Sequence, residues 1–121
     1  MEHEYVEYKV IEDKRIVVAQ ISGIRYDAIN VFNDKFMAHA TSNLSMSALR
    51  DQKFFMPKSM KAVARCIPED EFSVEEGKRI ALKKLSEKYN NSLDRHLRHI
   101  YNTMNKCLDN MGAYLKEHKM I

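Results

Sequence analysis

The chain is poor in the residues that mark several common classes of enzyme and secreted protein. Only three glycines occur in 121 residues, and neither a P-loop, a dinucleotide-binding fingerprint nor a nucleophile elbow is present. Catalysis is therefore not supported by any motif, and we expect a protein that is not an enzyme and needs no cofactor. The two cysteines, Cys66 and Cys107, lie far apart without a C-x-x-C partner, which argues against a disulfide framework and against a cysteine zinc site. We expect both to be small buried apolar residues.

Long apolar runs are also lacking. No stretch approaches the roughly 18 residues that a membrane-spanning helix needs, and the amino terminus is acidic and polar, unlike a signal peptide. Apolar residues make up 45% of the chain and charged residues 31%, which is ordinary for a folded soluble protein. We expect one domain over residues 1–121, located in the cytoplasm and without membrane contact.

Positive charge is concentrated in the second part of the chain. Residues 1–73 carry 10 basic and 11 acidic side chains, whereas residues 74–121 carry 10 basic and 6 acidic ones. This excess is mild, so it does not by itself indicate nucleic-acid binding.

The first third of the chain predicts a hairpin followed by a helix. Val6, Tyr8 and Val10 alternate with charged residues, and a β-branched run over 16–19 predicts a second, more buried strand. Asp27 is a candidate cap for a helix that continues to about His39 and packs across the sheet. The residues spaced to share its apolar face are Ile29, Phe32 and Phe36.

The middle of the chain predicts a loop and then more strand. Residues 41–53 are rich in Ser, Asn and Asp, which favour turns, with one helical turn expected over 47–50. The stretch "FFMPKSMKAVARC" favours two short strands around Pro57, and thus a second hairpin.

The stretch "CIPEDEFSVEEGKRIALKKL" predicts a joint between a strand and a helix. Ser73 and Glu76 form a capping box, and Gly77 in the first turn indicates close backbone packing. The acids over 69–71 could bind a metal or act as acid and base, but they also stabilise the positive end of a helix dipole, and we favour this second interpretation.

Two helices are expected after this joint, separated near Asn90 and Asn91. The second contains a heptad seam with spacings of 4, 3, 4, 3, 4 and 3, which favours a homo-oligomer formed through this helix. The seam consists of Leu93, Leu97, Ile100, Met104, Cys107, Met111 and Tyr114. The expected fold class is α+β: two hairpins make a small antiparallel sheet with one packed helix (1–66), and a helical part follows (67–121).

Basic residues crowd the predicted carboxy-terminal helices. Such a run is often a solvated face stabilised by i, i+4 pairs, but it also suits a nucleotide-type ligand with phosphate groups, on which aromatic side chains could stack. The candidate ligand-binding residues are Arg65, Phe72, Lys78, Arg79, Tyr89 and Arg95. His96 and His99 have a spacing that can place two imidazoles on one metal, but the sequence shows no third ligand nearby, so no metal site is predicted.

The motif C-x-x-x-D-x-F-x-x-x-x-G-x-x-x-A occurs at Cys66, Asp70, Phe72, Gly77 and Ala81. It resembles a module of small, mostly uncharacterised proteins of bacteriophages and prophages of Gram-positive bacteria. Some of these are similar in layout to the first Thoeris anti-defence family, which sequesters cyclised ADP-ribose signals. The resemblance covers about a sixth of the chain and carries over no ligand-binding residue.

The resemblance implies a phage accessory protein that counters host immunity in the bacterial cytoplasm. It would act by holding a nucleotide-type signal or by masking a host defence protein. Two alternatives remain open on the sequence: a nucleic-acid-binding regulator that uses the basic helices, and a structural phage component without a ligand.

Overall fold

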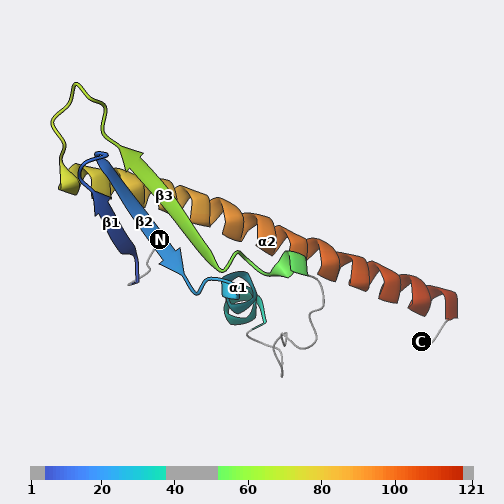
Figure 1. The fold of residues 1–121 in the computed structure, drawn as a ribbon. Coiled ribbons are helices and arrows are strands. Elements are labelled where there is room, and N and C mark those ends of the chain that lie inside the picture. Colours follow the sequence, from blue (N-terminus) through green and yellow to red (C-terminus); the bar gives the residue numbers. More distant parts are fainter. Residues whose placement is uncertain (1–4, 38–51, 119–121) are drawn as a thin grey trace.

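The computed structural model describes residues 5–37 and 52–118 (Figure 1). The elements are β1 (Glu7–Ile11), β2 (Ile16–Ser22), α1 (Asp27–Phe36), a short 3-10 helix η1 (Gln52–Phe54), β3 (Ser59–Arg65) and α2 (Val74–His118). The three strands form one antiparallel sheet in the order β1-β2-β3, and α2 runs along one face of it. The predicted α+β class is confirmed.

The central strand β2 organises the core. Val17, Ala19 and Ile21 point toward the helices and are fully or almost fully buried, whereas Gln20 and Ser22 point to the opposite face and are exposed. This alternation is what a sheet with one covered face requires. The predicted first hairpin is confirmed, with β1 paired to β2 from Glu7↔Gln20 to Ile11↔Ile16.

The predicted second hairpin is wrong. The stretch that follows η1 contains one strand, β3, which pairs with β2 from Ile16↔Arg65 to Ser22↔Ser59. Before it, Phe54 and Met56 are buried in the core without being part of a strand. A short apolar run that fills a core has the same composition as a buried strand, and this explains the error.

Helix α1 begins at Asp27 rather than after it. Tyr26 is at the N-cap, where no side chain forms a capping hydrogen bond, so the predicted role of Asp27 as a cap is wrong. Of the predicted apolar face, Ile29 is buried and Phe32 packs against the core, but Phe36 is 65% exposed. The helix end predicted near residue 39 and the turn predicted over 47–50 lie outside the described residues.

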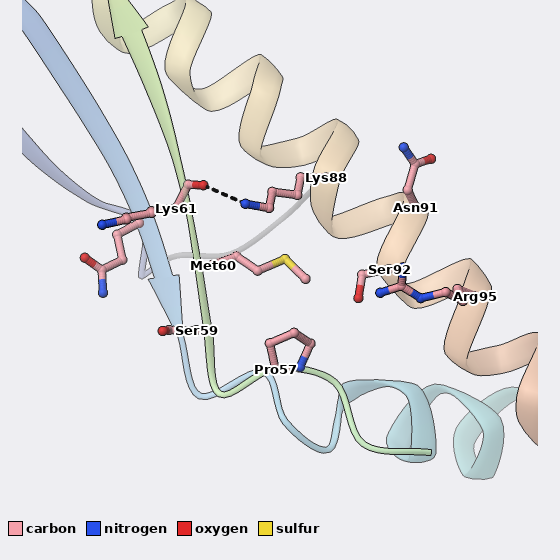
Figure 2. Close-up of a pocket in the computed structure, with 9 residues that line it drawn as sticks. Pro57, Ser59, Met60, Lys61, Lys88, Asn91, Ser92 and Arg95 are labelled. Atoms are coloured by element: carbon pink, nitrogen blue, oxygen red, sulfur yellow. Dashed lines mark hydrogen bonds between the residues drawn. The ribbon is translucent and has the colours of Figure 1, made fainter. Parts of the chain in front are cut away.

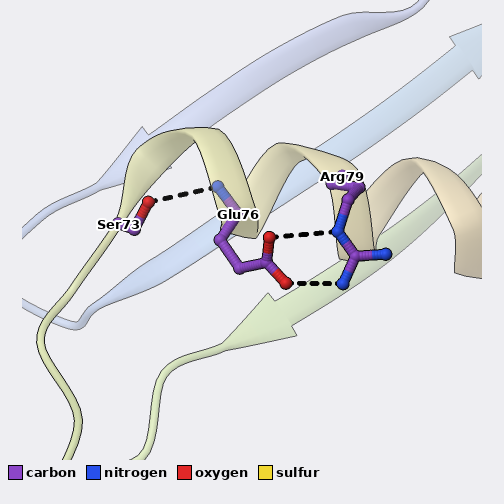
Figure 3. A network of polar contacts seen from close by, with 3 residues as sticks. All are labelled: Ser73, Glu76 and Arg79. Carbon is purple, nitrogen blue, oxygen red and sulfur yellow. Dashed lines mark hydrogen bonds and ion pairs between the residues drawn. The ribbon is translucent and has the colours of Figure 1, made fainter.

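The start of α2 is the predicted joint between a strand and a helix, but only the Ser73 half of the predicted capping box is confirmed, because the Glu76 carboxylate pairs with Arg79 rather than with the Ser73 backbone (Figure 3). The Glu76 backbone N–H donates to Ser73 Oγ at 3.2 Å, while the Glu76 carboxylate pairs with Arg79, whose Nε donates to Oε2 at 3.0 Å. A Cβ atom at Gly77 would lie 2.5 Å from Val17 Cγ2. Glycine is therefore required here because the helix backbone packs directly on β2.

The loop that precedes α2 is held by Arg15. This residue lies in the turn of the first hairpin with a φ of 55°, and its Nη2 donates to the Asp70 carbonyl and to Cys66 Sγ. Cys66 is half-buried, but Cys107 is exposed, so the expectation that both cysteines are buried is wrong for the second.

A single helix, α2, replaces the two predicted carboxy-terminal helices. It runs without interruption through Asn90 and Asn91 because Tyr89 and Ser92 on either side of them are buried against the rest of the protein. The low helix propensity of asparagine, roughly 0.5–0.7 kcal/mol relative to alanine, is small beside this packing. None of the described helices combines the length and the apolar composition that a bilayer crossing requires.

The predicted heptad seam divides into two parts. Ile100 is fully buried, and Leu93, Leu97 and Met104 pack partly buried against the core. From residue 105 onward, every described residue of α2 is exposed, including the seam members Cys107, Met111 and Tyr114. The carboxy-terminal part of α2 extends beyond the sheet and α1 (Figure 1).

Candidate anion-binding groove

Helix α2 lies beside the outer edge of β3, and two lysines connect them. Lys84 Nζ donates to the Val63 carbonyl and Lys88 Nζ to the Lys61 carbonyl, each at 3.3 Å. Because alternate residues of a strand direct their carbonyls to the same side, both of these carbonyls point away from β2. The lysines thus satisfy an edge that would otherwise be open to pairing with another chain.

A cavity of about 590 Å³ opens between this edge and α2 (Figure 2). Its walls come from β2, from the segment around the start of β3, and from one face of α2. Ser92 and Arg95 extend from α2 toward Pro57 and β3. The lining residues are Gln20, Pro57, Ser59, Met60, Lys61, Lys88, Asn91, Ser92 and Arg95.

The charge of this cavity is of one sign. Lys88 and Arg95 contribute two cations from α2, and Lys61 adds a third whose side chain extends from β3 away from the helix (Figure 2), while none of the nine lining residues is acidic. Within the described part of the chain, the side chains of Lys61 and Arg95 have no ion-pair partner. The remaining polar lining consists of amides and hydroxyls, which hydrogen-bond without opposing an anion.

Ser92 is the buried polar residue of the cavity wall. It is 4% exposed, and its Oγ has no hydrogen-bond partner. A buried hydroxyl without a partner costs about 1–3 kcal/mol, so such groups are rare in folded proteins. Ser92 shares the α2 wall of the cavity with Lys88 and Arg95, and a ligand with acceptor oxygens bound there would give its hydroxyl a partner.

A second cavity of about 420 Å³ shares Pro57 and Arg95 with the first. Arg25 and Lys58 add two more cations, and Phe55 forms part of its wall. The Arg25 guanidinium lies 5.1 Å from the centre of the Phe55 ring. We name these two adjacent cavities, which share Pro57 and Arg95, the cationic groove.

His96 also lines the second cavity. Its Nδ1 lies 2.7 Å from the Lys53 carbonyl, and because a carbonyl only accepts, Nδ1 carries the proton. Nε2 is buried and has no partner. The His96 and His99 rings are 6.2 Å apart, and the described residues contain no group of three or more His, Cys, Asp or Glu placed to hold a metal ion.

The residues predicted as one binding patch are divided among different sites. Arg65 and Phe72 line a smaller cavity of about 220 Å³ near the start of α2. Asp70, Glu71 and Glu76 line it too, which makes it unsuitable for an anion. Arg79 forms an ion pair with the Glu76 carboxylate. The Arg79 hydrogen bond lowers the pKa of Glu76 and raises that of Arg79 itself.

Two further predicted residues have other partners. The Lys78 ammonium lies 5.5 Å from the centre of the Tyr8 ring. Tyr89 is a core residue whose hydroxyl donates to Asp27 Oδ2 at 2.7 Å, so the expectation that it stacks on a ligand at the surface is wrong. Burial, together with the Asp27 carboxylate, raises the pKa of Tyr89 well above its ordinary value.

Of the predicted site residues, only Arg95 belongs to the cationic groove. Sequence reasoning missed Lys61 and Ser92, and noted Lys88 only as part of a basic run. The sequence does contain a signal for the α2 side of the groove: Lys88, Ser92 and Arg95 are spaced by four and three residues, so they share one face of a helix. Lys61 could not be added from the sequence, since that required knowing that β3 lies beside this face.

Searches against protein-family models, curated proteins and solved structures find no match to this chain.

Proposed function

We propose that this chain is a binding protein that captures a phosphate-bearing, nucleotide-type small molecule in the cationic groove. The observation that carries the proposal is the larger cavity, which is lined by three cations, by no acid and by the buried unpartnered hydroxyl of Ser92. Its volume of about 590 Å³ falls within the roughly 300–1,000 Å³ typical of small-molecule sites.

Each part of the groove has a role that its chemistry suits. Arg95 can hold a phosphate through two parallel hydrogen bonds, while Lys88 acts as a point charge and the Ser92 hydroxyl donates. Lys61, on the far side of β3, adds positive charge at the rim of the cavity. In the second cavity, Phe55 offers an aromatic surface beside Arg25.

The proposed biological role is sequestration in the bacterial cytoplasm. The resemblance of the Cys66–Ala81 motif to phage proteins supports a phage accessory protein that counters host immunity. Cyclic nucleotides and cyclic ADP-ribose isomers are therefore the first ligands to test. Masking of a host defence protein is the variant of this role that requires no small ligand.

Calorimetric titration with these nucleotides tests the proposal. We expect binding by the wild type and a loss of about 10- to 100-fold in affinity for Arg95→Ala, because a charged hydrogen bond contributes roughly 1.5–3 kcal/mol. Ser92→Ala should weaken binding less. The matched control is Arg98→Ala on the same helix, since Arg98 pairs with Asp94 at 2.8 Å and does not line the larger cavity. Absence of heat with every ligand, or equal losses for Arg95→Ala and Arg98→Ala, would contradict the proposal.

A nucleic acid is the second candidate ligand. It is favoured by the adjacency of the two cavities, which share Arg95 and place five cations along one groove that could follow a phosphate backbone. Binding to single-stranded DNA or RNA would then fall steeply as salt increases, whereas a small ligand with few phosphates would show a shallow salt dependence.

A further inference from the structure

The carboxy-terminal part of α2 projects from the body of the protein. All residues from Asn105 to His118 are exposed, and the picture of the fold shows this segment extending past the sheet and α1 (Figure 1). A helix without tertiary contacts is marginal in water, because most helix stability in proteins comes from packing of an apolar face.

The composition of this segment does not compensate for the lack of contacts with the other described residues. Seven of the eleven residues over 102–112 have low helix propensity: Asn102, Thr103, Asn105, Cys107, Asp109, Asn110 and Gly112. The helix is nevertheless continuous to His118. Its stability therefore points to a surface that packs on its apolar side.

An apolar stripe runs the length of the projection. It consists of Leu97, Tyr101, Met104, Leu108, Met111 and Leu115, at spacings of 4, 3, 4, 3 and 4. These are the positions that face a partner in a two-helix coiled coil. Leu97 and Met104 are partly buried against the core, whereas Tyr101, Leu108 and Met111 are 67%, 59% and 55% exposed, so the outer part of the stripe is not covered by the rest of the described chain.

The stripe begins at an apolar cavity of about 350 Å³ between α1 and α2. Its lining is Phe32, Phe36, Leu97, Arg98 and Tyr101. The exposed Phe36 thus belongs to the same surface as the stripe, and a helix that pairs with the stripe can place a side chain in this cavity.

We propose that the apolar stripe pairs with the same stripe of a second copy of this chain, in antiparallel orientation. With Phe36 and Tyr114, it presents six large apolar side chains per copy that are 37% to 67% exposed. A pair that covers them would bury an area on the order of 1,000 Å², which is the lower limit for a specific interface.

Charge favours a second copy and selects the orientation. Residues 101–118 carry two basic and two acidic side chains, so two such segments meet without net repulsion. Residues 74–100 carry seven basic and four acidic side chains. A parallel pair would bring these basic parts together, whereas an antiparallel pair separates them and aligns the helix dipoles favourably.

The spacing also sets the register. An antiparallel pair centred between Leu108 and Met111 places Leu108 of one copy opposite Met111 of the other, and Met104 opposite Leu115. Gly112 lies near this centre, and a Cβ atom there would contact nothing within 4 Å in the single chain. The copies can therefore approach closely at the middle of the interface.

Sedimentation equilibrium of the full chain tests the pairing. The wild type should have the mass of a dimer, twice the 14.2 kDa of one chain, and the Leu108→Asp variant should be monomeric. The matched control is Ala113→Asp, which adds the same charge on the opposite side of the helix and should leave the pair intact. Circular dichroism distinguishes loss of pairing from loss of fold, and Met111→Asp provides a second disrupting variant. A single-chain mass for the wild type at every concentration, or assembly into large rings or particles, would overturn the proposal.

Cross-linking tests the orientation. In a background with Cys66 and Cys107 replaced by serine, Met104→Cys chains should form disulfides with Leu115→Cys chains in a mixture, and not with themselves. Self-linking of each variant would overturn the antiparallel arrangement. Neither substitution touches the cationic groove, so ligand binding and pairing can fail independently.

Discussion

The two ends of α2 are parts of one helix with different sources of stability. Over residues 74–100 the helix packs on the sheet, with Ala81, Leu85 and Ile100 fully buried. Over 101–118 it carries large apolar side chains in solvent, such as Leu108 at 59% exposure. The difference teaches that heptad periodicity identifies an apolar surface but does not identify the partner that covers it. The same chain covers the first part of α2, and by our proposal a second copy covers the second part.

The largest expected effect comes from removing a core side chain of the packed part. Leu85→Ala should lower the free energy of unfolding by about 2–5 kcal/mol, because it leaves a cavity in a fully buried site. Leu108→Ala should change the free energy of unfolding by far less, as measured by urea unfolding at concentrations where the protein is monomeric. Equal effects of the two substitutions would contradict the division of α2 into a packed and an unpacked part.

The two glycines of α2 give the next comparison. Gly77→Ala should destabilise the fold by about 1–3 kcal/mol, because the added methyl group meets Val17 and overpacks the core. The methyl group added by Gly112→Ala contacts nothing in the monomer, so this substitution should raise local helix stability by up to about 1 kcal/mol. Thermal unfolding of both variants measures the contrast, and a stabilising Gly77→Ala would disprove the close contact.

Tyr89→Phe tests how α2 is attached to α1. Loss of the hydrogen bond to Asp27 should cost about 1–2 kcal/mol. The folded-state pKa of Tyr89 is raised above its ordinary value of 10.0, so its contribution is fully present below pH 10 and declines as the pH rises beyond that value. The wild type should therefore lose stability above pH 10 more steeply than Tyr89→Phe. If the stability of the wild type and of Tyr89→Phe declined equally above pH 10, the Tyr89 hydroxyl would not be hydrogen-bonded to Asp27 in a buried site.

The smallest expected effect is at the start of α2. Ser73→Ala removes the acceptor for the Glu76 N–H and should cost about 1 kcal/mol, as is usual for a helix cap. Ser86→Ala, in the interior of the same helix, serves as the control and should be close to neutral. Chemical denaturation can resolve the difference, and an equal response at both positions would rule out the cap.

Local signals in the sequence were sufficient for part of this fold. The first hairpin follows from alternation around Val6–Val10, and the start of α2 from Ser73 and Glu76. The second hairpin and the break at Asn90 were mispredicted, because local propensity there is outweighed by contacts distant in sequence. Phe54 fills the core without forming a strand, and Tyr89 and Ser92 hold the helix together through the asparagines.

The candidate site was harder to predict than the fold. Arg95 was chosen from its position in a basic run, but Lys61 and Arg25 join it only after β3 and the segment before α1 are placed. Conversely, Arg79 looked available in the sequence and is paired with Glu76 in the structure. Charge composition indicated a ligand class, and only the tertiary arrangement indicated where that ligand would bind.

The central claim is that anionic ligands bind between α2 and β3, and a nuclear magnetic resonance titration of the isotope-labelled chain with pyrophosphate tests it most directly. The account predicts that backbone amide signals of residues 58–61 and 88–96 shift together and saturably. Shifts confined to residues 65–80 or 101–118, or none at all, would contradict it.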